Sequence, residues 1–207
     1  REIMASMGIA KFDDLVGRTE LLKVLDGITA KQNRLDLSPL LAQPKAGDHT
    51  RLFCSQTTNA PIDKGELNAQ MLKDGQQAVV DGKSITLKYP IRNTDRSVGA
   101  LLSGEIAKHH GNHDFEDTPI KVELTGTAGQ SFGVWNAGGL HMHLEGDAND
   151  YVGKGMTGGK LVIHPPRNIS YDAHDSAIMG NTCLYGATGG KLFAAGRAGE
   201  RFGVRNS

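Results

Sequence analysis

The chain has 207 residues, enough for one large domain or two small ones with a real hydrophobic core. Its 23 basic and 23 acidic residues cancel, and no apolar run approaches about 18 residues, so neither nucleic acid nor a membrane is an expected partner. Two cysteines, Cys54 and Cys183, are too few for a disulfide framework or a thiolate cluster, which indicates a reduced, cytoplasmic compartment.

The first 80 residues carry scattered signals, and we expect them to form a linker arm of short helices and loops rather than an independent domain. Residues 1–25 show apolar positions at helical spacing, broken at Gly8 and Gly17. Residues 63–74 predict a further helix. Because the chain begins with Arg1 and stops at Ser207 just after a repeated motif, we expect a piece excised from a longer polypeptide.

Beyond residue 80 short apolar stretches predict strands. Residues 84–89 alternate as a strand, and residues 103–110 predict a short helix or turn. Five more stretches follow, each bounded by glycine and too short for an ordinary helix. They lie at residues 120–124, 140–144, 161–163, 178–179 and 192–193. The first two alternate apolar with polar residues, so each predicts a strand with one buried face.

Glycine motifs return along this region. Residues 126–136 and 196–206 share seven of eleven positions, and Gly-x-x-Gly-Gly-Lys-Leu occurs at both 155–161 and 186–192. Self-similarity of this kind is typical of repeat architectures. Strands recurring roughly every 17 to 18 residues leave no room for a crossover helix in each repeat, as in a parallel β-helix. An antiparallel sandwich is the alternative, although it does not predict glycines at the same place relative to each strand.

The sequence thus predicts a mainly β protein, a parallel β-helix or solenoid, with glycines where the chain turns or where backbones approach closely. The candidate structural turn glycines are Gly126, Gly129, Gly133, Gly155, Gly158, Gly186, Gly189, Gly196, Gly199 and Gly203.

A dinucleotide-type motif, G-x-G-x-x-G, occurs at residues 153–158. That motif holds pyrophosphate only between a strand and the first turn of a helix. Here a strand closed by Pro165 and Pro166 follows, so we interpret the match as accidental and expect no cofactor-binding residue.

Histidines cluster at His109, His110 and His113 and again at His141 and His143, where alternate positions share one strand face. The second pair could bind a metal, but no cysteine or third histidine lies at ligand spacing, so we expect no metal site.

Two acidic turns complete the candidates. Asp147, Asn149 and Asp150 are interpreted as turn caps rather than calcium ligands, because the aspartate does not recur in the sister repeat. Asp172 and Asp175 around His174 predict a solvated turn rather than an acid–base pair. We therefore name no catalytic residue.

Residues 144–159, 178–190 and 198–207 closely resemble the C-terminal, GXGXG-repeat domain of the glutamate synthase large (alpha) subunit. Residues 1–8 and 12–22 resemble the segment that leaves the FMN-binding barrel of that family. The resemblance implies a right-handed β-helix over residues 81–207, truncated at its C-terminal end, preceded by the linker arm of residues 1–80.

The resemblance also implies a function. The parent enzymes are glutamine-dependent glutamate synthases, in which an amidotransferase releases ammonia and an FMN and iron–sulfur centre completes glutamate synthesis. The residues for these steps lie upstream of Arg1, so this fragment is expected to bind no cofactor and to have no activity of its own. Its implied role is a non-catalytic scaffold that braces the upstream amidotransferase and FMN-barrel domains.

A docking module is the alternative role, since similar repeats occur in a formylmethanofuran dehydrogenase subunit. Its partner would be a reductase subunit or ferredoxin, and the sequence leaves the electron donor open.

Overall fold

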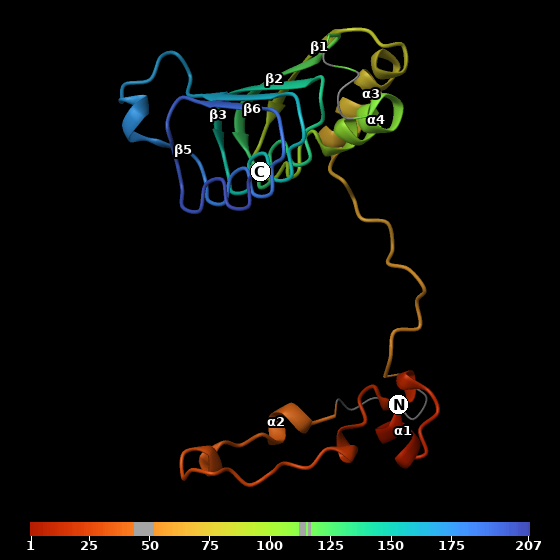
Figure 1. The fold of residues 1–207 in the computed structure, drawn as a ribbon. Coiled ribbons are helices and arrows are strands. Elements are labelled where there is room, and N and C mark those ends of the chain that lie inside the picture. Colours follow the sequence, from red (N-terminus) through yellow and green to blue (C-terminus); the bar gives the residue numbers. More distant parts are fainter. Residues whose placement is uncertain (44–51, 112–114, 116) are drawn as a thin grey trace. The chain divides into compact units, whose positions relative to one another are not determined.

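A computed structural model describes residues 1–43, 52–111, 115 and 117–207 (Figure 1). The chain divides into two compact units, Arg1–Pro61 and Ile62–Ser207. Each unit is described by itself. No helix within the described residues has both the length and the apolar character needed to cross a bilayer.

The first unit consists of short helical elements joined by extended chain. They are α1 (Glu2–Ser6), η1 (Phe12–Leu15), η2 (Thr19–Leu21), η3 (Gln32–Arg34) and α2 (Ser38–Leu41). The expected breaks at Gly8 and Gly17 are confirmed, because both residues have positive φ angles, 69° and 76°. The side chain of Gln43 joins separate parts of this unit, donating to the Gly17 carbonyl at 3.0 Å. That residues 1–80 leave an upstream barrel stays a prediction.

The second unit is built on a five-stranded sheet in which every neighbouring pair is parallel (Figure 1). Its strands lie in the order β1 (Ile85–Ile91), β2 (Ile120–Ala128), β3 (Leu140–Ala148), β4 (Lys160–His164) and β6 (Lys191–Ala194). A second, two-stranded parallel sheet pairs β5 (Ala177–Met179) with β7 (Arg197–Ala198). The predicted strands are confirmed, and the antiparallel alternative is wrong for every described pair.

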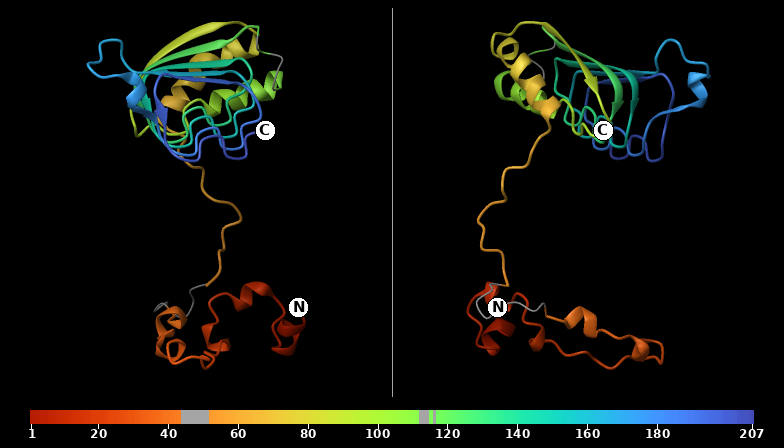
Figure 2. Two further views of the ribbon diagram at one scale, coloured as in Figure 1. Left: turned by 60° about the vertical axis from the view of Figure 1, so that its left-hand side comes forward. Right: turned by 180° about the vertical axis from the view of Figure 1, so that it is seen from behind.

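Two helices complete this unit at the β1 side of the sheet, α3 (Glu66–Val80) and α4 (Ala100–His110) (Figure 2). They pack on each other, and α3 also packs on β1. Met71 and Leu102 from these helices join the hydrophobic core that the strands form. The helix expected at residues 63–74 is confirmed but begins later and runs further.

A side-chain hydrogen bond ties α3 to β1. The hydroxyl of Tyr89 donates to Oδ2 of Asp74 at 2.7 Å. Burial, together with this bond to a carboxylate, raises the pKa of Tyr89 well above its ordinary value. Hydrogen bonds from Gln70 and Tyr89 lower the pKa of Asp74. The helix is therefore attached to the strand by polar as well as apolar contacts.

The predicted right-handed β-helix is wrong: the chain has an α/β fold, with helices packed beside a mostly parallel sheet. The repeated motifs do not belong to uniform coils. Ile85 pairs with Ile120, yet Ile120 pairs with Leu140, so partner strands do not return at a constant interval. The longer connection from β1 to β2 contains α4, and that from β4 to β6 contains η4 (Ala173–Asp175) and β5.

The parallel register explains which side chains form the core. Val122 pairs with Met142 and Met142 with Leu161, and all three are buried. Because successive strand residues point to opposite faces, Lys121 and His141 lie on the outer face. The period-2 pattern in the sequence is thus the pattern of one buried and one exposed sheet face.

Candidate functional site: the corner ridge

Four similar turn segments lie side by side, and together we call them the corner ridge. They comprise residues 131–136, 151–156, 182–187 and 201–206. In each segment the first, third and fifth residues have positive φ angles. These residues are Ser131, Gly133, Trp135, Tyr151, Gly153, Gly155, Thr182, Leu184, Gly186, Arg201, Gly203 and Arg205. Such angles are routine for glycine and cost other residues free energy, so the ridge concentrates backbone strain.

Backbone hydrogen bonds join each segment of the corner ridge to the next. Ser131 N donates to Asp150 O at 2.8 Å, and Trp135 N donates to Lys154 O at 2.8 Å. A bond in the opposite direction runs from Gly153 N to Phe132 O at 2.9 Å. The same three bonds recur between the second and third segments, as Tyr151 N to Asn181 O, Gly155 N to Tyr185 O and Leu184 N to Val152 O. These paired groups hold the strained turns in place.

One column of ridge side chains points into the core. Phe132, Val152 and Cys183, at equivalent positions of successive segments, have no exposed surface. Phe202, in the last segment, is 50% exposed. Burial raises the pKa of the Cys183 thiol, which keeps it protonated at neutral pH. The cysteine therefore behaves as a small core residue.

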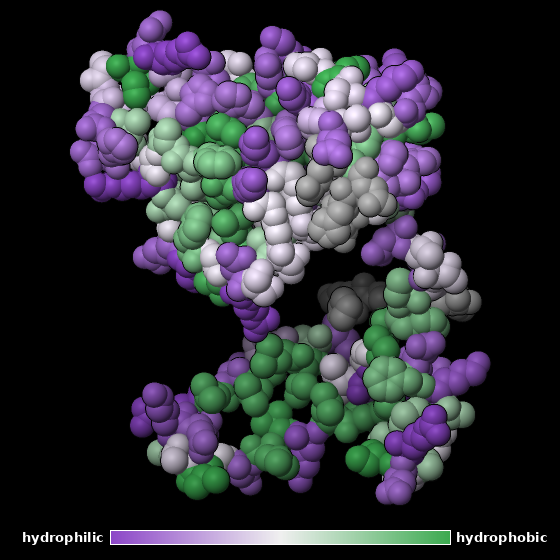
Figure 3. All heavy atoms as spheres, turned by 45° about the horizontal axis from the view of Figure 1, so that its top comes forward, coloured by the Kyte–Doolittle hydropathy of each residue, from purple (hydrophilic) through white to green (hydrophobic). Residues whose placement is uncertain are grey.

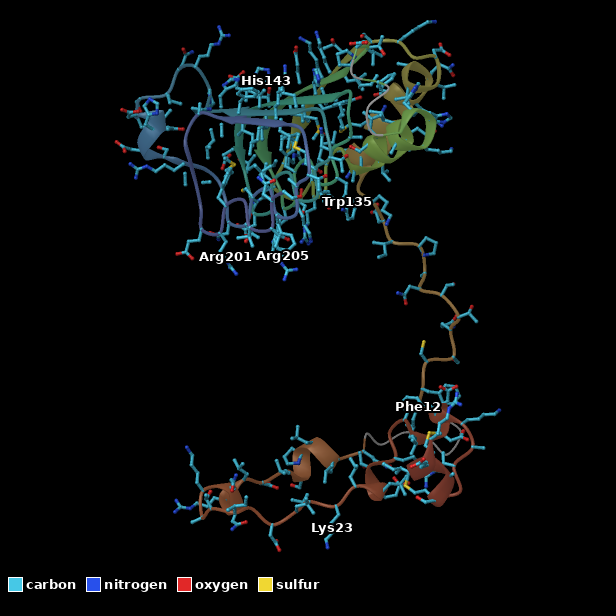
Figure 4. The ribbon with its side chains drawn as sticks, in the orientation of Figure 1. Phe12, Lys23, Trp135, His143, Arg201 and Arg205 are labelled. Atoms are coloured by element: carbon cyan, nitrogen blue, oxygen red, sulfur yellow. The ribbon has the colours of Figure 1, made fainter. Side chains whose placement is uncertain are left out.

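The outward side of the corner ridge carries aromatic and basic side chains. Trp135 is 62% exposed, and Figure 4 shows it on the same edge of the unit as Arg201 and Arg205. The ammonium of Lys154 lies 5.3 Å from the ring centroid of Tyr151 and 5.9 Å from that of Tyr185. These distances allow cation–π attraction. The ridge thus presents residue types that are enriched in protein interfaces.

The structure places the candidate turn glycines in three settings. Gly133, Gly155, Gly186 and Gly203 have positive φ angles within the corner ridge. Gly126 and Gly196 have positive φ angles within or beside a strand. Gly129, Gly158, Gly189 and Gly199 are limited by space, because a Cβ atom on any of them would meet the backbone of another segment. Their structural roles stay predictions until substitutions test them.

The remaining candidates differ in setting. Asp147 lies within β3, not in a turn, and its Oδ1 accepts a hydrogen bond from Thr127 Oγ1 at 2.7 Å, so its interpretation as a turn cap is wrong. Asp150 Oδ1 accepts a hydrogen bond from Asn181 N at 2.7 Å, and Asp172 Oδ1 accepts one from His174 N at 2.9 Å. The bond to Asp150 is the kind that a turn-capping residue makes, and Asp172 lies in an exposed turn. The G-x-G-x-x-G match at residues 153–158 overlaps the second half of the second ridge segment and leads into β4.

The histidines that the structure describes do not assemble into one group. His110 stacks on Phe115 with centroids 4.5 Å apart, whereas His143 meets His164 edge to face at 4.8 Å. His113 lies outside the described residues. Within the described ranges no three His, Cys, Asp or Glu side chains gather around a point where a metal ion could bind.

Asn136 is a buried structural residue that is not among the candidates taken from the sequence. Asn136 is fully buried, and its Nδ2 donates to the carbonyls of Leu140 and Gly158, both at 3.0 Å. The backbone carbonyl of Asn136 accepts hydrogen bonds from Thr157 N and Gly158 N. Asn136 thereby ties the first ridge segment to the chain entering β4. The signal was present in the sequence, because the related motif has Asn206 at the same place.

Trp135 gives the corner ridge a spectroscopic probe. A Cβ atom at Gly155 would lie 2.7 Å from Cδ1 of Trp135, so we expect Gly155→Ala to displace the indole. Acrylamide quenching of the only tryptophan in the chain should then increase. Gly186→Ala is the matched control, because Gly186 has a similar φ angle but nothing within 4 Å of its Cβ position. Equal quenching changes in the two variants would contradict the proposed contact.

Comparison with known proteins places these features in a family. The model of the GXGXG motif family matches residues 68–207. Over its full length the chain is 46% identical to ferredoxin-dependent glutamate synthase 2 of Synechocystis sp. and 41% identical to the glutamate synthase [NADPH] large chain of Azospirillum brasilense. It is also 43% identical to glutamate synthase [NADH] of Schizosaccharomyces pombe.

The chain spans only 13%, 14% and 10% of the lengths of these three relatives. Their names nevertheless agree across ferredoxin, NADPH and NADH forms, which confirms the resemblance seen in the sequence. The chain belongs to the GXGXG motif family, in the form found in glutamate synthases.

Proposed function

We propose that the chain is a non-catalytic structural domain of a glutamine-dependent glutamate synthase, bracing its amidotransferase domain and its FMN and iron–sulfur synthase domain. Its partners would be those upstream domains of the same polypeptide, in the cytoplasm. The names of the relatives support the enzyme class. The bracing role is supported chiefly by one observation. Each layer of this unit, meaning a strand together with the ridge turn that follows it, is hydrogen-bonded to the next layer at two separate places.

These two places are the large sheet and the corner ridge. Across the sheet, β2 pairs with β3 over nine residues in unbroken register. Across the ridge, the turns that follow the same strands are joined by the bonds from Ser131 N and Trp135 N. A layer that is bonded to its neighbour both in the sheet and in the ridge resists sliding and rotation against that neighbour. Such a body can keep two reacting centres at a fixed separation, and small misplacements at reacting centres are costly.

The non-catalytic part of the proposal has a direct test. We expect the 207-residue chain, prepared without other domains, to show no flavin absorbance and no glutaminase or glutamate synthase turnover. Full-length enzyme prepared in parallel is the positive control. A yellow preparation with a flavin spectrum, or measurable turnover by the chain, would contradict the proposal.

The bracing role needs a test in the complete enzyme. Asn136→Ala removes two hydrogen bonds of the corner ridge and changes no residue of an upstream domain. It should therefore lower the glutamate formed per glutamine hydrolysed while flavin content stays constant. Asn206→Ala, at the exposed equivalent position, should leave that ratio unchanged. If the ratio is unchanged in an Asn136→Ala enzyme whose melting temperature has fallen, bracing is not the role of this domain.

The outward face of the corner ridge favours a second candidate, docking of a reductase subunit or ferredoxin. Tryptophan and arginine dominate binding energy at many interfaces, and Trp135, Arg201 and Arg205 are all exposed. Retention of purified electron donor on the immobilised protein at low salt, lost in Trp135→Ala, would support docking. Absence of retention at low salt counts against it.

A further inference from the structure

A row of basic residues crosses the outer face of the large sheet. Lys121 pairs with His141, His141 with Lys160, and Lys160 with Lys191, so one residue from each of four neighbouring strands enters the row. We call these four residues the lysine row. It lies on the sheet face where Figure 4 labels His143, and hydrophilic side chains gather there (Figure 3).

The lysine row places like charges next to one another. Paired residues on neighbouring strands are separated by about 5 Å, and like charges directly opposite destabilise a sheet. Lys160 and Lys191 are such a pair. Within the described part of the chain neither has an ion-pair partner. An anion shared between the two ammonium groups would remove the repulsion.

The next row along the same face is built differently. There Lys88 pairs in register with Glu123, and Lys88 Nζ lies 2.7 Å from Glu123 Oε2. The hydrogen bond from Lys88 lowers the pKa of Glu123, as expected for a carboxylate held by a cation. The sheet therefore pairs Lys88 with a carboxylate, whereas Lys160 and Lys191 have no ion-pair partner among the described residues.

A hollow of about 250 Å³ opens at the lysine row. Its lining consists of His141, Gly159, Lys160, Gly190 and Lys191, all basic residues or glycines. Space of this size admits several water-sized groups. Both glycines have positive φ angles, 70° and 92°, and add no side chain to fill the space.

The repeated sequence accounts for this arrangement. Gly-Gly-Lys occurs at residues 158–160 and again at 189–191, and the parallel register brings the two copies together. Each copy turns with positive φ at its second glycine and then presents a lysine at the first position of its strand. Two basic turns from segments far apart in sequence thus face one hollow.

We propose that this hollow binds a doubly charged tetrahedral oxyanion, with inorganic phosphate as the simplest representative. An ion with two negative charges matches two lysine ammonium groups, which are compact donors suited to phosphate oxygens. A single carboxylate would neutralise only one of them. The hollow is also small, about 250 Å³, which suits an ion better than an extended acidic protein segment. This site is independent of the bracing role.

Titration of the protein with phosphate at low ionic strength tests the site, followed by calorimetry and by amide NMR shifts. We expect saturable binding, with the largest shifts at the amides of Gly159, Lys160, Gly190 and Lys191. Lys160→Ala should weaken binding about tenfold or more, because a hydrogen bond between charged groups is lost. Lys88→Ala is the matched control on the same sheet face and should leave binding unchanged.

A second variant separates lost binding from lost folding. Lys191→Glu places a carboxylate opposite Lys160, so an attractive pair replaces the like-charge pair. This variant should raise the melting temperature while abolishing phosphate binding. Sulfate should compete with phosphate, whereas acetate should compete far more weakly. Equal weakening by Lys88→Ala and Lys160→Ala, shifts spread over the whole sheet, or preference for a glutamate-rich peptide over phosphate would overturn the proposal.

Discussion

Replacing Gly146 with alanine is expected to lower the free energy of unfolding by about 3 kcal/mol or more, combining backbone strain with overpacking. Gly146 pairs in register with Gly126 between β2 and β3, at a φ angle of 151°. A Cβ atom at Gly146 would meet the carbonyl of Gly126, with the carbonyl carbon 2.8 Å away. The clashing atoms belong to the backbone of β2, which is hydrogen-bonded to β3. The clash can therefore be removed only if the two strands move apart.

Gly186→Ala is the matched control for Gly146→Ala. Gly186 has a φ angle of 65° but no atom within 4 Å of its Cβ position, so it isolates the conformational cost. That cost is about 1–2 kcal/mol. Urea denaturation of both variants gives the comparison. If the two substitutions cost the same, close approach of β2 and β3 does not limit residue 146.

Removing the side chain of Asn136 is expected to cost about 2–4 kcal/mol, because each of two buried carbonyls loses a donor. Its Nδ2 donates to Leu140 O and Gly158 O, both at 3.0 Å. Asn136→Asp should be at least as damaging, since it keeps the shape but replaces the donor with an acceptor. Chemical denaturation of Asn136→Ala and Asn136→Asp measures both effects.

Asn206→Ala provides the control, because Asn206 occupies the equivalent place in the last ridge segment and is exposed. Its substitution should change stability by no more than about 0.5 kcal/mol. Asn136 Oδ1, in contrast, is buried without a hydrogen-bond partner among the described residues. Side-chain donation, rather than full satisfaction of the amide, is therefore what the residue contributes. A small effect of Asn136→Ala would show that other donors replace it.

The strands were predictable from the sequence for a local reason. Alternation around Val122 and Met142 specifies one apolar face, whatever the strand pairs with. The predicted β-helix is wrong because similar glycine motifs do not impose connections of equal length between strands. Helix α4 begins directly after Gly99, where the other layers continue into a ridge turn. Nothing in the glycine spacing encodes that departure.

The candidate site residues also differ in whether local sequence is enough to identify them. The turn glycines could be selected from the sequence, because glycine alone adopts many of these backbone angles at low cost. The related motif with Asn206 marks the position of Asn136 but not its hydrogen-bond partners, and no motif marks the lysine row. Both roles depend on partners elsewhere in the chain that only the fold brings close. Lys160 and Lys191 look like ordinary surface lysines until the register places them opposite each other.

By itself the sequence determined the short strands, the repeated turns and the resemblance to glutamate synthases, because each of these is written in local residue patterns. Only the tertiary structure decided that helices α3 and α4 join the sheet and which strand residues face one another. Pairing between strands depends on the lengths and paths of the connections, which periodicity does not record. Packing and register therefore had to come from the folded chain.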